Sequence, residues 1–212
     1  MATAVAGITI PRTPLTEEAT ALVRHATDDL LFDHSSRVFY FGALQGHRRG
    51  LDPDLELLYV GALFHDLGLT AGYATATRRF EVDGAEVARQ FLLDHGRTAA
   101  EATLVWTAIA LHTTPGVPEF LDPEIALVTA GVETDVLGIG YHDLPQTAID
   151  AVVAAHPRVD VKRRLLAAFH AGNVHRPETT FGNVNADVLA RFDPAFQRTD
   201  FVDVIESSPW PS

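Results

Sequence analysis

The chain has 212 residues, of which 28 are acidic and 16 are basic, giving a formal net charge of −12. Apolar residues make up 47% of it, which is enough for a sizeable core and excludes a disordered tail protein. The acidic balance argues against a general binder of nucleic acid or of anionic membranes, because both need clustered lysine or arginine. Cysteine is absent, which excludes disulfide scaffolds, thiol nucleophiles and Cys-based metal sites, whereas ten histidines are available as ligands.

The chain shows no pattern of a targeting or membrane segment. The start has no basic residue before Arg12, and Pro11 cuts its apolar run short. No later stretch approaches the roughly 18 apolar residues of a membrane span. We therefore expect a cytoplasmic protein with no membrane partner, and the sequence leaves its oligomeric state open.

Helix punctuation recurs along the whole chain, whereas only residues 5–10 could form an extended segment. Caps, prolines and glycines predict helices at about 16–31, 34–47, 52–68, 83–95, 98–114, 122–138, 143–156 and 160–172. Three of these starts, at Asp83, Thr98 and Asp143, resemble capping boxes. We expect one all-α domain over residues 1–212, with its core at about 31–140. The helices and tail of residues 141–212 should pack on that core.

Two His-Asp dipeptides occur, and because the composition alone gives about one by chance, the dipeptide by itself carries no weight. His142-Asp143 lies in a predicted turn, where Asp143 would cap a helix and His142 would be exposed. His65-Asp66 instead ends a segment that is apolar on nearly every face, which is typical of a buried helix. A buried imidazole and carboxylate need partners, either a metal ion or a backbone carbonyl and an arginine.

Three further polar residues lie where the predicted helices face inward. His34 lies near the start of the second helix, and His112 follows Ala108 by one turn on an apolar face. Asp135 lies inside the sixth helix, three residues after Val132, where a carboxylate needs a partner. Together with His65-Asp66, these residues offer nitrogen and oxygen ligands of the kind that zinc, iron, manganese or nickel accept.

The order His34, His65-Asp66, Asp135 resembles the HD superfamily of metal-dependent hydrolases, all-α proteins whose ligands come in that order from three helices. Four segments are also similar to cyanamide hydratase and its HD-domain relatives, namely 34–40 (HSSRVFY), 63–68 (LFHDLG), 80–84 (FEVDG) and 109–113 (IALHT). The resemblance covers about residues 31–137. It implies a single HD-domain helical bundle.

The resemblance also implies roles for individual residues. His34, His65, Asp66 and Asp135 would hold one divalent ion, which we expect to be zinc, with iron, manganese or nickel as alternatives. His112 would lie beside the metal. Several HD phosphodiesterases have a lysine three residues after the aspartate, where this chain has Leu69, and the adjacent histidine pair of binuclear relatives is absent. His95 lies at a predicted helix end, where the helix dipole explains it without a metal.

The first functional hypothesis is a hydratase that adds metal-activated water to a small molecule with a nitrile-like carbon, as cyanamide has. Asp66 would take the proton of the water and His112 would deliver one to the developing nitrogen anion. Phe39, Phe64 and Trp106 would line an apolar pocket for this small-molecule substrate. We expect the following residues to bind the substrate: Arg37, Phe39, Phe64, Glu81 and Thr113.

Two alternatives stay open. The first is a phosphohydrolase acting on a nucleotide or related ester, which needs cations near the phosphate. Arg37 could point at the site or pair with Asp29 or Asp33, and Arg78 and Arg79 could cover the pocket or remain solvated. The second is a metal-stabilised helical binding module, in which protein ligands would fill every coordination position of the metal. Glu81 could be a surface acid or part of a lid, and Asp83 is expected to cap a helix.

Overall fold

The computed structural model describes residues 4–210. Within this range the fold is all-α, as predicted, and its strand-like pairing is limited to one isolated bridge between Val5 and Ile8. The α-helices are α1 (Pro14–Ala26), α2 (Asp29–Arg49), α3 (Leu55–Phe64), α4 (Phe80–Asp94), α5 (Ala99–Leu111), α6 (Pro123–Val132), α7 (Gln146–Ala155), α8 (Val161–Asn173), α9 (Asn185–Phe192) and α10 (Phe201–Glu206). None of the helices in the described range is both long and apolar enough to span a bilayer.

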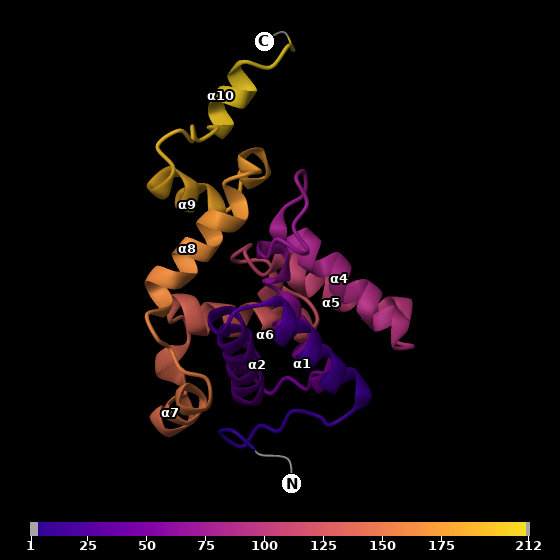
Figure 1. Cartoon of the computed structure of the whole chain (residues 1–212). Coiled ribbons are helices and arrows are strands. Elements are labelled where there is room, and N and C mark those ends of the chain that lie inside the picture. The colour runs from indigo at the N-terminus through magenta and orange to yellow at the C-terminus, as the bar shows by residue number, and fades with distance from the viewer. Residues whose placement is uncertain (1–3, 211–212) are drawn as a thin grey trace.

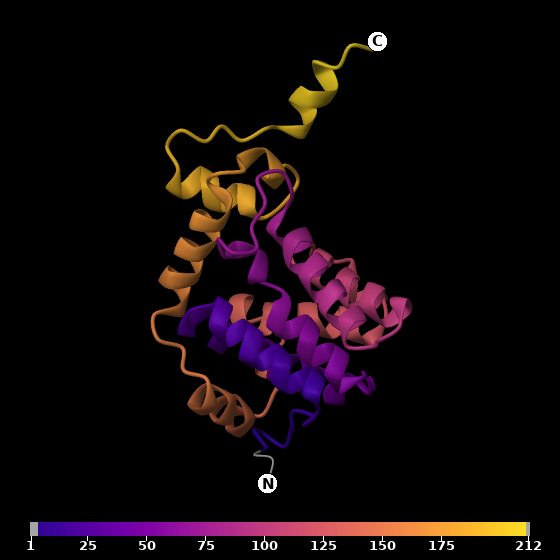
Figure 2. The same cartoon turned by 45° about the vertical axis from the view of Figure 1, so that its right-hand side comes forward.

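Helices α1 to α6 form the body of the molecule, and the chain from α7 onward runs along one side of it (Figures 1 and 2). Buried apolar side chains of the body make one continuous core that includes Phe39, Leu58, Phe64, Ile109 and Leu127. Helix α3 is apolar on all faces and lies among α1, α2, α5 and α6, as the sequence predicted. Its C-terminal end therefore lies deep inside the protein.

The first helix boundary differs from the prediction. We expected one helix to reach Leu31 and the next to begin at His34, but α1 ends at Ala26 and α2 begins at Asp29. The Asp28 side chain accepts a hydrogen bond from the Leu31 backbone N–H at 3.0 Å and caps α2. His34 consequently lies more than one turn inside a long buried helix, which fixes its direction.

A glycine contact brings α2 and α6 unusually close together. A Cβ atom on Gly131 would lie only 2.1 Å from the Val38 carbonyl oxygen, so this position accepts no side chain without a backbone shift. After α6 the chain continues as a π-helical turn, η3 (Glu133–Leu137), which carries Asp135. The close approach of the two helices therefore brings Asp135 next to His34.

Two of the three predicted capping boxes are wrong. Thr98 and Glu101 cap α5 reciprocally, as predicted. Helix α4, however, begins at Phe80, so Asp83 lies inside it, buried and paired with Arg176 at 2.6 Å. Helix α7 begins at Gln146 without a side-chain cap, and Asp143 instead lies 3.4 Å from Arg48.

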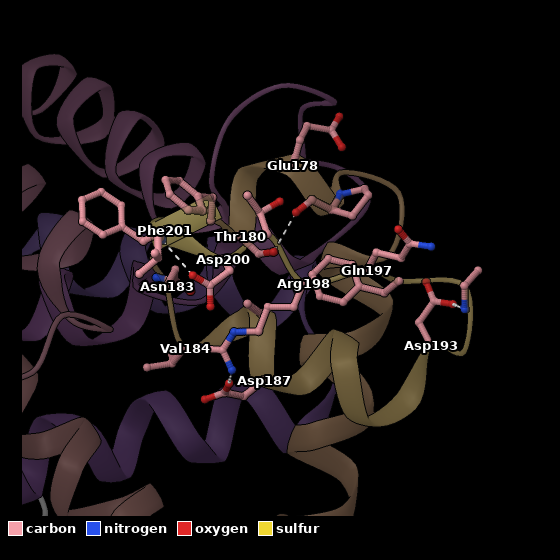
Figure 3. A pocket seen from close by; sticks show the side chains of 18 residues that line it. Glu178, Thr180, Asn183, Val184, Asp187, Asp193, Gln197, Arg198, Asp200 and Phe201 are labelled. Carbon is pink, nitrogen blue, oxygen red and sulfur yellow. Dashed lines mark hydrogen bonds and ion pairs between the residues drawn. The ribbon is translucent and has the colours of Figure 1, made fainter. Parts of the chain in front are cut away.

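The tail beyond His175 packs back on the body only in part. Leu189 of α9 is fully buried, whereas Phe181, Val184 and Phe192 remain about half exposed. Helix α9 lies against α8, and α10 extends away from the rest of the molecule (Figures 1 and 2). A cleft of about 1230 Å³ separates the turn before α9 from the segment that leads to α10 (Figure 3).

Candidate metal centre

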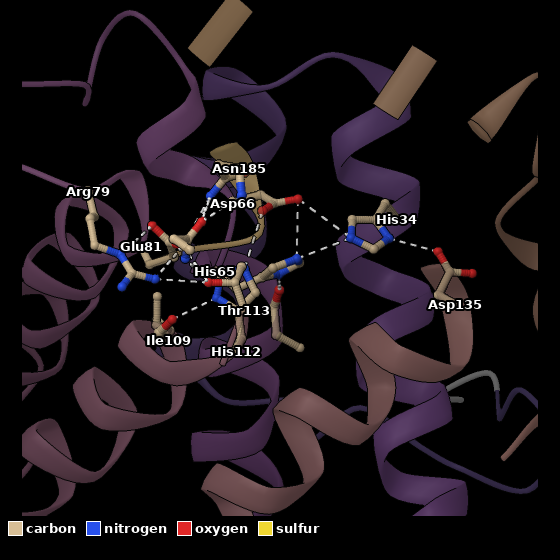
Figure 4. Close-up of polar contacts among 12 residues, drawn as sticks. His34, His65, Asp66, Arg79, Glu81, Ile109, His112, Thr113, Asp135 and Asn185 are labelled. Atoms are coloured by element: carbon tan, nitrogen blue, oxygen red, sulfur yellow. Dashed lines mark hydrogen bonds and ion pairs between the residues drawn. The ribbon is translucent and has the colours of Figure 1, made fainter. Parts of the chain in front are cut away.

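Two imidazoles and one carboxylate converge in the centre of the helical body (Figure 4). His34 comes from α2, and His65 and Asp66 follow the last residue of α3. The Nε2 atoms of His34 and His65 lie 3.1 Å apart, and Asp66 Oδ2 lies 3.5 Å and 3.2 Å from them, respectively. One donor atom from each residue lies within 4.8 Å of the other two, and all three side chains are buried. This spacing suits a single ion between them.

The hydrogen bonds made by Nδ1 of each histidine fix which ring nitrogen faces this centre. Nδ1 of His65 lies 2.7 Å from the Ala62 carbonyl oxygen, and Nδ1 of His34 lies 2.7 Å from Asp135 Oδ2. These oxygens can only accept, because a carbonyl has no proton and Asp135 is ionised; Nδ1 must therefore carry the hydrogen. In the neutral imidazoles both Nε2 lone pairs point inward, as metal ligation requires.

The Asp66 carboxylate carries the strongest sign of a bound cation. Within the described part of the chain, both of its oxygens are buried without a hydrogen-bond partner. Burial raises the pKa of the Asp66 carboxyl, but His65, His34 and His112 lower it by more, so Asp66 stays ionised. Burial likewise lowers the pKa of His65, yet Asp66 outweighs it and the net pKa is raised. The site therefore favours a positive charge, and a divalent metal fits this donor set.

Asp135 does not join this group, although we expected it to be the fourth ligand. Its carboxylate binds the rear nitrogen of His34 and also receives Arg37, whose Nε and Nη2 lie 2.8 Å and 3.0 Å from Oδ1 and Oδ2. Arg158 contacts it as well. The π-helical turn places the carboxylate behind the imidazole of His34, on the side away from His65 and Asp66, where it can orient the ring.

His112 lies beside the three candidate ligands, as expected. It caps the end of α5, its ring centroid is 4.8 Å from that of His65, and its Nε2 is 3.8 Å from Asp66 Oδ1. Nδ1 donates to the Ile109 carbonyl oxygen at 2.6 Å, so Nε2 of the neutral ring is an acceptor that faces the centre. Burial and the neighbouring His65 lower the pKa of His112 to about 4, which keeps it neutral at physiological pH. Phe80, which the sequence did not single out, packs against its ring at 5.6 Å.

Arg37 and the predicted aromatic lining do not lie where the sequence suggested. Arg37 is fully buried on Asp135 and on the carbonyl oxygens after α7, and it pairs with neither Asp29 nor Asp33. Its donors are thus occupied by protein acceptors. The three aromatic residues also make internal contacts: Phe39 with Tyr40 and Tyr59, Phe64 with Phe91, and Trp106 with Glu86.

A second buried polar cluster adjoins His112 (Figure 4). Glu81 of α4 is 1% exposed, which excludes a surface acid, and it accepts hydrogen bonds from Arg79 at 2.9 Å and from Thr113. Asn183 and Asn185 from the tail complete it, with Asn183 Nδ2 at 2.9 Å from both Glu81 Oε1 and Thr113 Oγ1. The sequence pointed to Glu81 and Thr113 but not to the two asparagines, because nothing in their local pattern indicates a partner about 100 residues away.

The two histidines that we assigned to other roles lie elsewhere. His95 caps the end of α4 and contacts Glu18 at 3.0 Å, as its position at a helix end suggested. His142 is exposed, as predicted. Neither contributes to the buried cluster.

Comparison with known proteins is consistent with this geometry. No curated protein matches the chain significantly. The family model of the HD domain matches residues 31–155, which include all three converging residues, His112 and Asp135. The match begins at residue 31, where we expected the core to start, and ends about 15 residues after residue 140, where we expected the core to end. Because it covers more than half of the sequence, the chain belongs to the HD domain family.

Proposed function

We propose that this protein is a metal-dependent hydratase that adds water to a small uncharged molecule with a nitrile-like carbon, of which cyanamide is the model. Membership of the HD family points to a metal-dependent enzyme of the hydrolase type, and the buried His34-His65-Asp66 group can hold one divalent ion. Zinc suits two imidazoles and one carboxylate, and three protein ligands leave a position for water, as in catalytic zinc sites. That open position argues against a purely structural metal.

The observation that carries the proposal is the pairing of the arginines around the site. Each guanidinium that contacts a residue of the site is paired with a carboxylate: Arg37 and Arg158 share Asp135, and Arg79 pairs with Glu81. A phosphohydrolase needs cations that are available to its anionic substrate. Leu69, at the position of the phosphodiesterase lysine, packs against Gly172 of α8 instead. Because each of these guanidiniums is already bound to a protein carboxylate and the lysine is absent, a neutral substrate is favoured over a phosphate ester.

The protein groups account for the movement of the proton. A bound divalent ion lowers the pKa of water toward neutrality. As the water oxygen bonds to the substrate carbon and one carbon–nitrogen π bond breaks, Asp66 Oδ1 can accept the water proton. His112 Nε2 lies 3.8 Å from that oxygen, so one bridging water would relay the proton to it. His112 then delivers it to the nitrogen anion and returns to its neutral state. Its low pKa makes the protonated form a strong donor, which suits a basic nitrogen.

Metal analysis and two substrates test the proposal. The purified protein is stripped, reloaded in turn with zinc, iron, manganese or nickel, and assayed for urea formation from cyanamide and for hydrolysis of bis(p-nitrophenyl) phosphate. We expect one ion per chain and turnover of cyanamide but not of the diester. Efficient diester hydrolysis with any of these metals would instead support the phosphohydrolase. A stoichiometric metal without turnover of either compound would contradict the hydratase.

A further inference from the structure

The chain beyond the HD match contributes side chains to the site. The match ends at residue 155, and the segment Asn173–Phe192, here called the C-terminal segment, contains Arg176, Asn183 and Asn185. The two asparagines touch Glu81, as described above. These contacts therefore lie outside the part of the chain that the HD model matches.

Arg176 fixes the C-terminal segment firmly against the body. Its guanidinium is fully buried and donates to Asp83 Oδ2 at 2.6 Å and to the carbonyl oxygens of Gly68, Thr75 and Arg78 at 2.7–3.1 Å. These acceptors belong to the turn after α3, the following loop and α4. The arginine thus holds three parts of the chain in one arrangement, which preorganises whatever the asparagines contact.

Glu81 is held as an ionised acceptor with spare capacity. Its Oε1 receives Arg79 Nη2, Thr113 Oγ1 and Asn183 Nδ2, whereas Oε2 has only a weak contact with Arg79 Nε at 3.4 Å. Burial raises the pKa of Glu81, but Arg79 and its other partners lower it by more. A buried carboxylate with one crowded and one nearly free oxygen can receive another N–H donor on the free side.

Asn183 also connects this cluster to the outside. It lines the cleft of about 1230 Å³ between the C-terminal segment and the chain leading to α10, where Figure 3 shows it beside Asp200 and Phe201. On its other side it donates to Glu81 and Thr113, and Thr113 directly follows His112. The same carboxamide thus lines an open cleft and belongs to the buried polar cluster beside His112.

We propose that Asn183 is a specificity-determining positioning residue, which holds Glu81 as the acceptor for an N–H group of the substrate. The substrate would then carry an amino or amide nitrogen next to its electrophilic carbon. This inference rests on the proposed hydratase function and assigns the C-terminal segment to substrate selection. The hydrogen bonds of Asn183 would be worth about ten- to a hundred-fold in apparent affinity for such a substrate.

The test compares cyanamide with N,N-dimethylcyanamide, which keeps the reactive N–C≡N group but has no N–H. Asn183→Leu keeps the approximate size of the side chain and removes its donors. We expect KM for cyanamide to rise about ten- to a hundred-fold, with kcat changed less than about threefold and KM for the dimethyl compound unchanged. Thr180→Val is the matched control, because Thr180 is buried in the same segment but its hydroxyl contacts only Pro177.

Metal content and melting temperature separate this role from a structural one. Metal content should be the same in Asn183→Leu and Thr180→Val, and the control should retain the preference for cyanamide. The melting temperature of Asn183→Leu should fall only slightly, because Asn183 Oδ1 also accepts the Asn185 backbone N–H at 2.8 Å. Should Asn183→Leu fail to fold, Glu81→Gln carries the test, because it removes the charged acceptor while keeping the shape, and it too should lose the preference.

Two results would overturn the inference in distinguishable ways. If wild-type protein hydrates cyanamide but Asn183→Leu changes the kinetics of both substrates equally or of neither, Asn183 does not select the substrate and the hydratase function stands. If metal-loaded wild-type protein hydrates neither compound, the proposed function fails and the inference fails with it.

Discussion

Asp135 and Asp66 are both buried carboxylates beside His34, yet their surroundings give them different roles. Asp135 receives His34 Nδ1 and the Arg37 guanidinium, so its charge is already balanced by protein groups. Asp66 has two oxygens without a hydrogen-bond donor in the described structure. A carboxylate without donors calls for a cation, whereas a paired one can orient the ligand in front of it.

Substitutions at Asp135 and His65 should therefore differ in their effect on metal binding. Asp135→Asn keeps an acceptor for His34 Nδ1, so we expect metal affinity to fall only about 10–100-fold. His65→Ala removes a ligand and should abolish metal binding. Because Asn leaves the buried Arg37 without its full counter-charge, Asp135→Asn should also lower the free energy of unfolding by about 3–5 kcal/mol. Elemental analysis and denaturant unfolding measure both effects; equal metal loss in the two variants would make Asp135 a ligand.

His112 should behave as a proton carrier and not as a ligand. In His112→Ala we expect a near-stoichiometric metal content and turnover reduced by about 10²–10⁴-fold, because the acceptor 3.8 Å from Asp66 is lost. Metal content, cyanamide turnover and melting temperature are measured on the same preparation. Loss of metal together with turnover would identify a ligand, and a lower melting temperature with normal turnover per folded molecule would identify a core residue.

At the scale of single elements, local sequence signals succeeded where the capping partners are local. The Thr98 hydroxyl accepts a hydrogen bond from the Glu101 backbone N–H at 3.2 Å. The two residues are three positions apart, so this capping box can be recognised from the sequence. Asp83 has a similar pattern, but Arg176, 93 residues later, draws its carboxylate into the interior. The position of Asp135 was missed in part for the same reason, because a π-helical turn and the distant Arg37 decide where its side chain points. Long-range ion pairs override local helix signals in both cases.

The contact between α2 and α6 should be sensitive to one methyl group. Gly131→Ala places a Cβ against the Val38 carbonyl oxygen, and backbone cannot move aside as a side chain does. We expect the free energy of unfolding to fall by at least about 1–3 kcal/mol, with weaker metal binding because α2 carries His34. Gly72→Ala is the control, since its Cβ would meet no neighbour within 4 Å. Equal stability of the two variants by urea unfolding would contradict the tight packing.

The connection between α7 and α8 should make the protein sensitive to mild acid. Burial lowers the pKa of His156 more than Asp33 raises it, so the folded protein binds this proton less readily than the unfolded chain. The stability that neutral His156 contributes is present above its unfolded pKa of about 6.5 and is lost as pH falls through that value toward the folded pKa. The free energy of unfolding should thus fall less between about pH 7.5 and 5.5 in His156→Gln than in the wild type. The exposed His142→Gln should keep the wild-type slope.

At the scale of the whole molecule, the sequence predicted the all-α body and the convergence of His34, His65 and Asp66 much better than it predicted the tail. The body has strong helical periodicity and residues that match the HD pattern, and both can be read from the chain. The contacts of Arg176, Asn183 and Asn185 span about 100 residues and follow no such pattern. The part of the site that lies beyond the HD match is therefore visible only in the structure.

Two truncations should show which part of the tail belongs to the folded unit. A chain ending at residue 194 loses α10, whose side chains are all exposed, and the exposed Arg198–Asp187 pair, so its free energy of unfolding should fall by less than about 1 kcal/mol.

A chain ending at residue 174 loses Arg176, which leaves the Asp83 carboxylate buried with a partly exposed Arg78 as its remaining ion-pair partner in the described range. Loss of Arg176 alone should cost about 3–5 kcal/mol, which Arg176→Met in the full chain measures, and the truncation should cost more because it also removes the buried Leu189. Denaturant unfolding of the three proteins measures the difference. If the chain ending at 194 were as unstable as the chain ending at 174, α10 would have to pack on the body in solution, contrary to its exposed position in the structure.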